Sequence, residues 1–305
     1  MSERYPVVQV KGIGGTLMAR DGLVVCFFIR RHHREIADKV WMSIQACLGA
    51  IPRGALAWYV DMDGEYQTLD ESGWAYIREK LLNRPQAIAC HVQLLQVDAG
   101  VGGYNFEYSG YQLDSSLHHD DNAACSLAFS LPTEYLLEHG ADKVSELALQ
   151  LSRELPYSFG YASLAFVSPS GSWYSVRQEM LPLLERYRGL DLYLLSKTSR
   201  LIGTGARGAY WLTFLGQPLL GQLGGLETLR RELDFPEVSF EPLDGDRVLL
   251  RLGEWPSAMD VREFIHRPHF TALARLLAPY FPDEQTGLTS IFDRRNMGRW
   301  LRRYL

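Results

Sequence analysis

The segment Val24-Val-Cys-Phe-Phe-Ile29, followed by Arg34-EIADKVWMSIQAC-Leu48 and Ala55-LAWYVD-Met62, determines the fold class. Its first and last parts are rich in β-branched and aromatic residues, which predicts strands. Between them, apolar residues recur at steps of three and four, which predicts an amphipathic helix ending near Gly49. The unit therefore reads strand, helix, strand.

A similar pattern recurs later in the chain. Strands are predicted over 124–130 and 161–167, with a helix over 141–155 between them. The pattern is shared but the residues are not, so two related strand-helix-strand halves remain a hypothesis. We place a boundary between residues 1–112 and 113–305, with a single compact unit as the alternative.

Further elements complete an α+β protein. Strands are predicted near 5–10, 87–97 and 209–216, and helices near 72–82, 175–188, 226–233, 269–277 and 289–304. Asp21-Gly22 is taken as a turn, and Asp244-Gly245 as the turn of a hairpin over 238–252. Because hairpins outnumber crossovers, we expect mixed, largely antiparallel sheets flanked by helices.

The charge is distributed unevenly along the 305 residues. The net charge is −5, and the stretch 61–142 contains 14 Asp and Glu against three Lys and Arg. Such a field of one sign repels nucleic acid and attracts a basic protein. We therefore expect a protein partner and no nucleic acid.

The N-terminus has no signal-peptide pattern, and no apolar run is long enough for a membrane helix, so we expect a cytoplasmic protein without a membrane partner. Cys26, Cys47, Cys90 and Cys125 lie within apolar runs, which is typical of buried free thiols.

Two motifs look like cofactor or metal sites, but the sequence around each does not fit such a site. Gly203-TGAR-Gly208 has the spacing of a dinucleotide fingerprint, but a β-prone run follows it where a helix would be required, so it is interpreted as a glycine-rich turn. His118, His119, Asp120 and Asp121 have metal-binding side chains, yet adjacent residues do not converge on one ion without further ligands. A solvated loop is favoured there, and a metal-dependent hydrolase remains an alternative.

The last twelve residues contain five arginines around Trp300 and Tyr304, namely Arg294, Arg295, Arg299, Arg302 and Arg303. A basic, aromatic tail suits nucleic acid, but cations are also common at the C-terminal end of a helix. Nucleic-acid binding is therefore a second alternative.

Three motifs resemble one known family. They are Arg186-YRGL-Asp191, Ile202-GTGARGAYWLTFL-Gly216 and Leu223-GG-Leu226, within a similarity extending from about Ser126 to Pro279. The chain resembles bacterial type VI secretion immunity proteins, whose partners are nuclease effectors of restriction-endonuclease or VRR-type folds. The resemblance implies a non-enzymatic protein that binds and neutralises a toxin. It implies no catalytic residue, metal site or cofactor, and the GTGARG segment is interpreted as a fold determinant because glycine permits special backbone shapes.

A nuclease surface that grips phosphates is basic, so the acidic stretch is the expected partner-binding face. Tyrosines interspersed among the acids suit the centre of an interface. The predicted contact residues are Asp61, Asp63, Glu65, Tyr66, Asp70, Glu71, Tyr104, Glu107, Tyr108, Tyr111, Asp114, Asp120 and Asp121.

Overall fold

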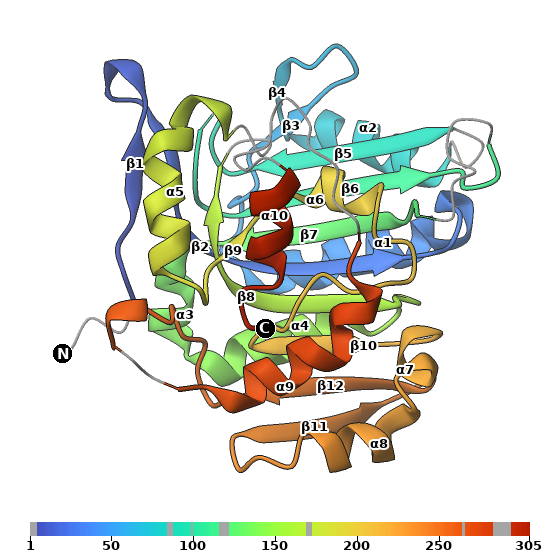
Figure 1. The fold of residues 1–305 in the computed structure, drawn as a ribbon. Helices are drawn as coiled ribbons and strands as arrows, with labels where there is room; N and C mark the ends of the chain where they lie inside the picture. The colour runs from blue at the N-terminus through green and yellow to red at the C-terminus, as the bar shows by residue number, and fades with distance from the viewer. Residues whose placement is uncertain are drawn as a thin grey trace.

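The computed structural model describes residues 5–83, 88–98, 100–115, 122–168, 173–263, 266–282 and 294–305. Within these ranges, twelve strands form one sheet in the order β11-β12-β10-β8-β2-β7-β6-β5-β3-β4, with β1 beside β2 and β9 beside β8 (Figure 1). All pairings are antiparallel except β8 with β9. The predicted α+β class with a largely antiparallel sheet is confirmed. The strands are β1 Gln9–Lys11, β2 Leu17–Ile29, β3 Trp58–Val60, β4 Tyr66–Thr68, β5 Ala89–Leu95, β6 Asn105–Tyr111, β7 Cys125–Leu131, β8 Phe159–Val167, β9 Asp191–Leu192, β10 Leu212–Leu215, β11 Val238–Leu243 and β12 Arg247–Leu252.

Strand β2 is the central strand, and it is longer than the sequence indicates. It is thirteen residues long and pairs with β7 through residues 23–29 and with β8 through residues 20–28. The predicted turn at Asp21-Gly22 is wrong, because both residues lie inside this strand. Gly22 is needed there for close approach: a Cβ atom would lie 3.2 Å from the Leu131 carbonyl oxygen. The Asp21 carboxylate accepts the Val8 N–H at 2.8 Å and so holds the segment before β1 against β2.

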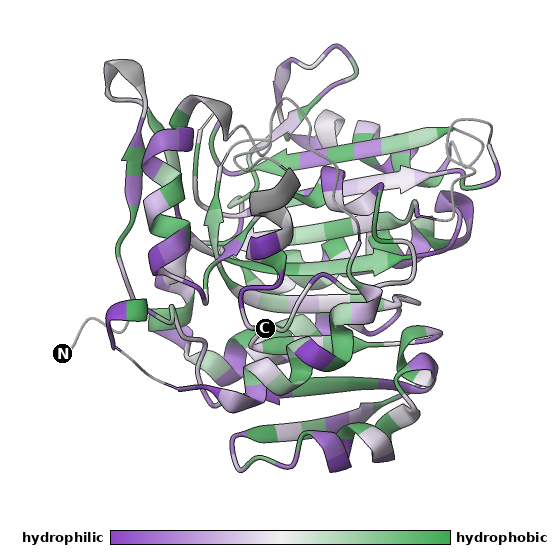
Figure 2. Ribbon diagram, viewed as in Figure 1, coloured by the Kyte–Doolittle hydropathy of each residue, from purple (hydrophilic) through white to green (hydrophobic). Residues whose placement is uncertain are grey.

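Helices cover both faces of the sheet (Figure 1). On one face lie α1 His33–Ala50, α2 Glu71–Leu82, α3 Thr133–His139 and α4 Ala141–Ser152. On the other lie α6 Leu195–Ser199, α9 Pro268–Leu277 and α10 Arg294–Leu301, while α5 Arg177–Arg186 lies beside β1. Helices α7 Leu219–Gln222 and α8 Gly225–Glu232 lie near the β11 edge. Figure 2 shows apolar residues concentrated in the central strands.

Helix α1 follows from its apolar spacing. Ile36, Val40, Ile44 and Cys47 are fully or almost fully buried, and the helix packs against α2 and α4. The four cysteines are buried free thiols, as predicted. Burial raises the pKa of Cys90 to about 11 and that of Cys47 to about 12, so these thiols stay protonated at neutral pH.

Both predicted strand-helix-strand units are crossover connections. Unit β2-α1-β3 skips three strands, whereas β7-α3-α4-β8 skips only β2. Helices α1 and α4 of the two units pack together. The sheet continues across the proposed boundary at residue 112, because β6 pairs with β7. The division into halves stays a prediction.

Strand β6 was not predicted. Its sequence, Asn105-FEYSG-Tyr111, contains polar residues and glycine, which lower strand propensity. It forms because β5 and β7 pair with it on both sides. Three of the predicted contact residues, Glu107, Tyr108 and Tyr111, lie in this strand.

Candidate functional site

A short hairpin, β3-β4, carries the first group of predicted acids at one edge of the sheet (Figure 1). We call Asp61, Asp63 and Glu65 the hairpin acids. The Asp61 carboxylate accepts the N–H groups of Asp63 at 3.0 Å and Glu65 at 2.9 Å, and the Gln67 side-chain amide at 2.9 Å. These hydrogen bonds, led by that of Glu65, hold the pKa of Asp61 below its usual value. Asp61 therefore shapes the turn, while Asp63 and Glu65 are exposed to solvent.

The hairpin acids are not neutralised by basic side chains in the described part of the chain. No Lys or Arg there lies within 4.0 Å of their carboxylate oxygens. Later acids of the run differ: Glu134 pairs with Arg20 at 2.7 Å, and Asp142 with Arg251 at 2.7 Å. The hairpin acids therefore keep their charge unpaired among the described residues, whereas Glu134 and Asp142 of the same stretch are paired with arginines.

Three other predicted acids have structural surroundings of their own. Asp70 caps α2 by accepting the Gly73 N–H at 2.9 Å, which holds the pKa of Asp70 below its usual value. Glu71 lies in the first turn of α2, where the helix dipole favours a negative charge. Asp114 lies 3.7 Å from the Arg34 guanidinium. Of these, Asp70 primarily stabilises the helix start.

The predicted tyrosines divide into two groups. Tyr108 and Tyr111 are each only 1% exposed, and the Tyr108 hydroxyl lies 2.8 Å from Nδ1 of His33. Tyr66 and Tyr104 are half-buried at the surface. The first two therefore belong to the core, and only the second two have accessible ring surface.

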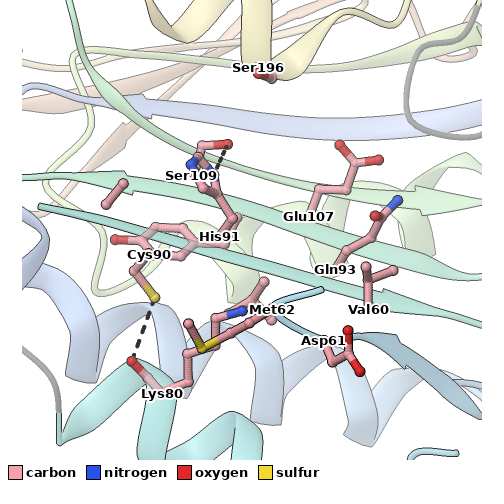
Figure 3. A pocket seen from close by; sticks show the side chains of 13 residues that line it. Val60, Asp61, Met62, Lys80, Cys90, His91, Gln93, Glu107, Ser109 and Ser196 are labelled. Carbon is pink, nitrogen blue, oxygen red and sulfur yellow. Dashed lines mark hydrogen bonds between the residues drawn. The ribbon is translucent and has the colours of Figure 1, made fainter. Parts of the chain in front are cut away.

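A hollow of about 540 Å³ adjoins the hairpin (Figure 3). Met62, between two hairpin acids, is 73% exposed and lines this hollow. The sequence signal for Met62 as a surface residue is its position as a single apolar residue among acids, and our list of predicted contact residues does not include it. The polar and charged groups lining the hollow are Asp61, Lys80, His91, Gln93, Glu107, Ser109 and Ser196.

Glu107 lies across from Gln93 on the wall formed by β5 and β6 (Figure 3). Burial raises the pKa of Glu107, and the Tyr193 hydroxyl partly counteracts this. On the same wall, Ser109 Oγ lies 3.3 Å from Nδ1 of His91. This wall offers carboxylate, amide, hydroxyl and imidazole groups for hydrogen bonding to a bound surface.

The predicted metal-like cluster, His118, His119, Asp120 and Asp121, lies outside the described residues, so two predicted contact residues do as well. Within the described ranges, no three His, Cys, Asp or Glu side chains are grouped so that they could hold a metal ion. The segment Gly203–Gly208 leads into strand β10 and not into a helix, as its interpretation as a turn requires.

Two of the family motifs meet in a buried ion pair. Arg207 of the GTGARG segment and Asp191 of the RYRGLD segment are 1% and 0% exposed, and they form a salt bridge of 2.5 Å. Tyr161 donates to Asp191 at 2.7 Å, Tyr210 donates to it at 3.1 Å, and Arg207 also donates to the Leu192 carbonyl at 2.6 Å. The motifs therefore carry a fold determinant in the core.

The C-terminal segment contacts this ion pair through Trp300. The Arg303 guanidinium lies 4.0 Å from the centre of the Trp300 ring and donates to the Arg188 carbonyl at 2.7 Å. The Arg207 guanidinium lies 5.4 Å from the same ring. Arg299 is exposed, and the structure does not describe the side chains of Arg294 and Arg295. Arg303 therefore packs against the protein's own C-terminal segment, and nucleic-acid binding by the other arginines stays an alternative.

Comparison with known proteins addresses the family directly. The family model described as type VI immunity for VRR-NUC, TsiV, matches residues 26–304. The chain belongs to the TsiV family. One solved structure similar to this TsiV protein is a Pseudomonas aeruginosa T6SS protein, PA0821, with 18% identity, a TM-score of 0.79, and coverage of 97% of this chain and 87% of that one. At this identity the likeness concerns the fold. No curated protein matches the sequence.

The predicted resemblance is thus confirmed, and it extends further toward the N-terminus than the motifs indicated. The family supports a type VI immunity role for this TsiV protein. Among its described helices, none is long and apolar enough to cross a membrane.

Proposed function

We propose that this protein neutralises a VRR-NUC-type nuclease effector by forming a stoichiometric complex with it in the cytoplasm. The match to the TsiV family over residues 26–304 carries the proposal. A nuclease acts on DNA inside the cell, so its inhibitor must meet it there. The protein acts by binding and requires no catalytic residue.

The contact face that we propose contains the hairpin acids, Met62 and the adjoining hollow. No Lys or Arg of the described residues forms an ion pair with these acids, so they attract the basic surface with which a nuclease grips phosphates. Met62 supplies a flexible apolar contact at the centre of that charge. Tyr66 and Tyr104 remain proposed contacts, as do Asp70, Glu71, Glu107 and Asp114.

The first experiment tests the function. The purified protein is mixed with the nuclease domain of its effector, and DNA cleavage and complex formation by size-exclusion chromatography are measured. We expect cleavage to stop at a one-to-one ratio. Full cleavage and the absence of a complex at micromolar concentrations would refute the proposed function.

The second experiment tests the face. Asp63→Lys with Glu65→Lys reverses two exposed charges, while Asp61 is kept because it shapes the turn. Electrostatic steering changes association rates by about 10-fold or more at low salt, so we expect at least that loss. The control is Glu241→Lys with Asp244→Lys, which reverses two exposed acids on the β11-β12 hairpin. Equal association rates for the two double variants would place the contact face elsewhere.

A further inference from the structure

A second hollow, of about 420 Å³, is lined in part by Gln217 and Pro218, directly before α7. The nearby strands β8, β10 and β12 lie on the opposite side of β2 from the acidic hairpin (Figure 1). Its walls come from the segment after β2, the segment between α4 and β8, the segment after β10, and the β11-β12 turn. Four arginines line it with a single carboxylate. These charged residues are Arg30, Arg31, Arg153, Arg247 and Glu154.

The excess of positive charge is unusual for this chain. The whole protein has a net charge of −5, so removing the four arginines and Glu154 leaves −8 on the rest. Glu154 lies 4.0 Å from Arg153, at the limit of an ion pair. The nearby acids Glu241 and Asp244 line a separate hollow of about 260 Å³ that also borders Arg153 and Arg247. The charge in the first hollow therefore attracts an anion locally, within an otherwise acidic molecule.

The four arginines have different parts in the site. The Arg247 side chain is held in place by backbone hydrogen bonds. It donates to the carbonyls of Asp244, Ser152, Leu155 and Arg153 at 2.6 to 3.2 Å. Its guanidinium also lies 5.3 Å from the centre of the buried Tyr157 ring. Carbonyl groups satisfy its N–H donors but do not cancel its charge. Arg247 therefore holds a positive charge at one place in the wall.

Arg31 and Arg153 are exposed at the rim, and the Arg153 side chain is 83% exposed. They present guanidinium forks that suit the oxygens of phosphate or carboxylate groups. Arg30 donates to the Ala123 carbonyl at 2.8 Å, which fixes its position at the end of β2. Ser158, Thr204 and Gln217 add hydrogen-bonding side chains to the wall.

From this arrangement we infer that the hollow is a binding site for a compact multivalent oxyanion, a phosphate-bearing or polycarboxylate small molecule. A volume of about 420 Å³ falls within the range of small-molecule pockets. An extended nucleic acid is disfavoured, because the rest of the protein carries a net charge of −8 and would repel a long polyanion. The inference is independent of the proposed toxin complex.

The test uses the full-length protein and measures binding calorimetrically with pyrophosphate, citrate and a 12-base-pair DNA duplex as probes, at one fixed salt concentration. We expect saturable binding of pyrophosphate or citrate with a Kd below about 1 mM, and the tighter of the two identifies the source of the oxyanion. Arg31→Gln with Arg153→Gln should weaken this binding at least tenfold. Arg247 is not changed, because its variant removes backbone contacts.

The matched control is Arg78→Gln with Arg231→Gln, two exposed arginines on α2 and α8 that do not line the hollow. It should bind the probe as the parent does. The inference is refuted if neither small probe binds at 5 mM, which is about five times the expected upper Kd. It is also refuted if both double variants lose binding equally, or if the duplex binds more tightly than either small anion.

Discussion

The buried pair Arg207–Asp191 yields the sharpest stability prediction. Asp191→Asn keeps the shape of the side chain and removes its charge. Asp191 is fully buried and accepts from Arg207, Tyr161 and Tyr210. The substitution therefore leaves the Arg207 cation in the core without its counter-ion.

Removing one partner of a buried ion pair costs about 3–5 kcal/mol. With an unfolding entropy of about 2.1 cal/mol/K per residue, 305 residues convert 1 kcal/mol into roughly 1.6 °C of Tm. We therefore expect Tm to fall by about 5–8 °C. Differential scanning calorimetry measures the shift, and chemical denaturation measures the free energy of unfolding.

Two comparison variants separate charge burial from general disruption. Glu227→Gln breaks an exposed pair with Arg230, in which Glu227 is 83% exposed, and should cost less than about 1 kcal/mol. Asp191→Leu with Arg207→Met removes both buried charges and should recover much of the loss, because an apolar replacement buries no ion. If Asp191→Asn costs less than about 1 kcal/mol, the buried ion pair does not stabilise the core.

Two further predictions concern pH and the contact face. His33 and His269 are buried, and burial lowers the pKa of each below 6.5, so the unfolded chain takes up protons first as the pH falls. The free energy of unfolding should therefore be highest above pH 6.5 and should fall below that pH by up to about 1.4 kcal/mol per pH unit for each histidine. Urea denaturation between pH 7.5 and 5.5 measures this fall. His269→Phe, beside Phe235 and Phe270, should flatten this decline, and an unchanged slope would contradict the assignment. Met62→Ala should weaken the affinity for the effector about tenfold without changing Tm. The control is Met42→Ala, at a methionine on α1 that is 49% exposed, and it should leave the affinity unchanged. Equal affinities of the two variants would exclude Met62 from the contact.

Local pattern predicted the elements that have strong periodicity. The apolar spacing from Ile36 to Cys47 places one face of α1 in the core, and the structure buries that face. Strand β6 and the full length of β2 could not be predicted in this way. Their polar residues and glycines, such as Gly22, are accommodated only because strands pair on both sides.

The contact face shows the same dependence on tertiary structure. The sequence presents Glu134 and Asp63 as equivalent members of one acidic run. Folding brings Arg20, 114 residues away from Glu134, into a salt bridge with it, whereas Asp63 stays exposed without a basic partner in the described residues. Counting charges along the sequence therefore locates the acidic stretch but does not show which of its acids remain unpaired in the folded protein.

The roles of neighbouring residues in the hairpin follow from backbone geometry rather than residue type. Asp61 and Asp63 are the same residue type, yet the Asp61 carboxylate accepts three hydrogen bonds that stabilise the turn, and no comparable bonds are made by the Asp63 carboxylate within the described residues. A charge reversal at Asp61 would change both the shape of the hairpin and its field, so a loss of binding could not be assigned to either cause. Reversals at Asp63 and Glu65 change the field alone, and these two positions therefore decide whether charge recognition operates at this face.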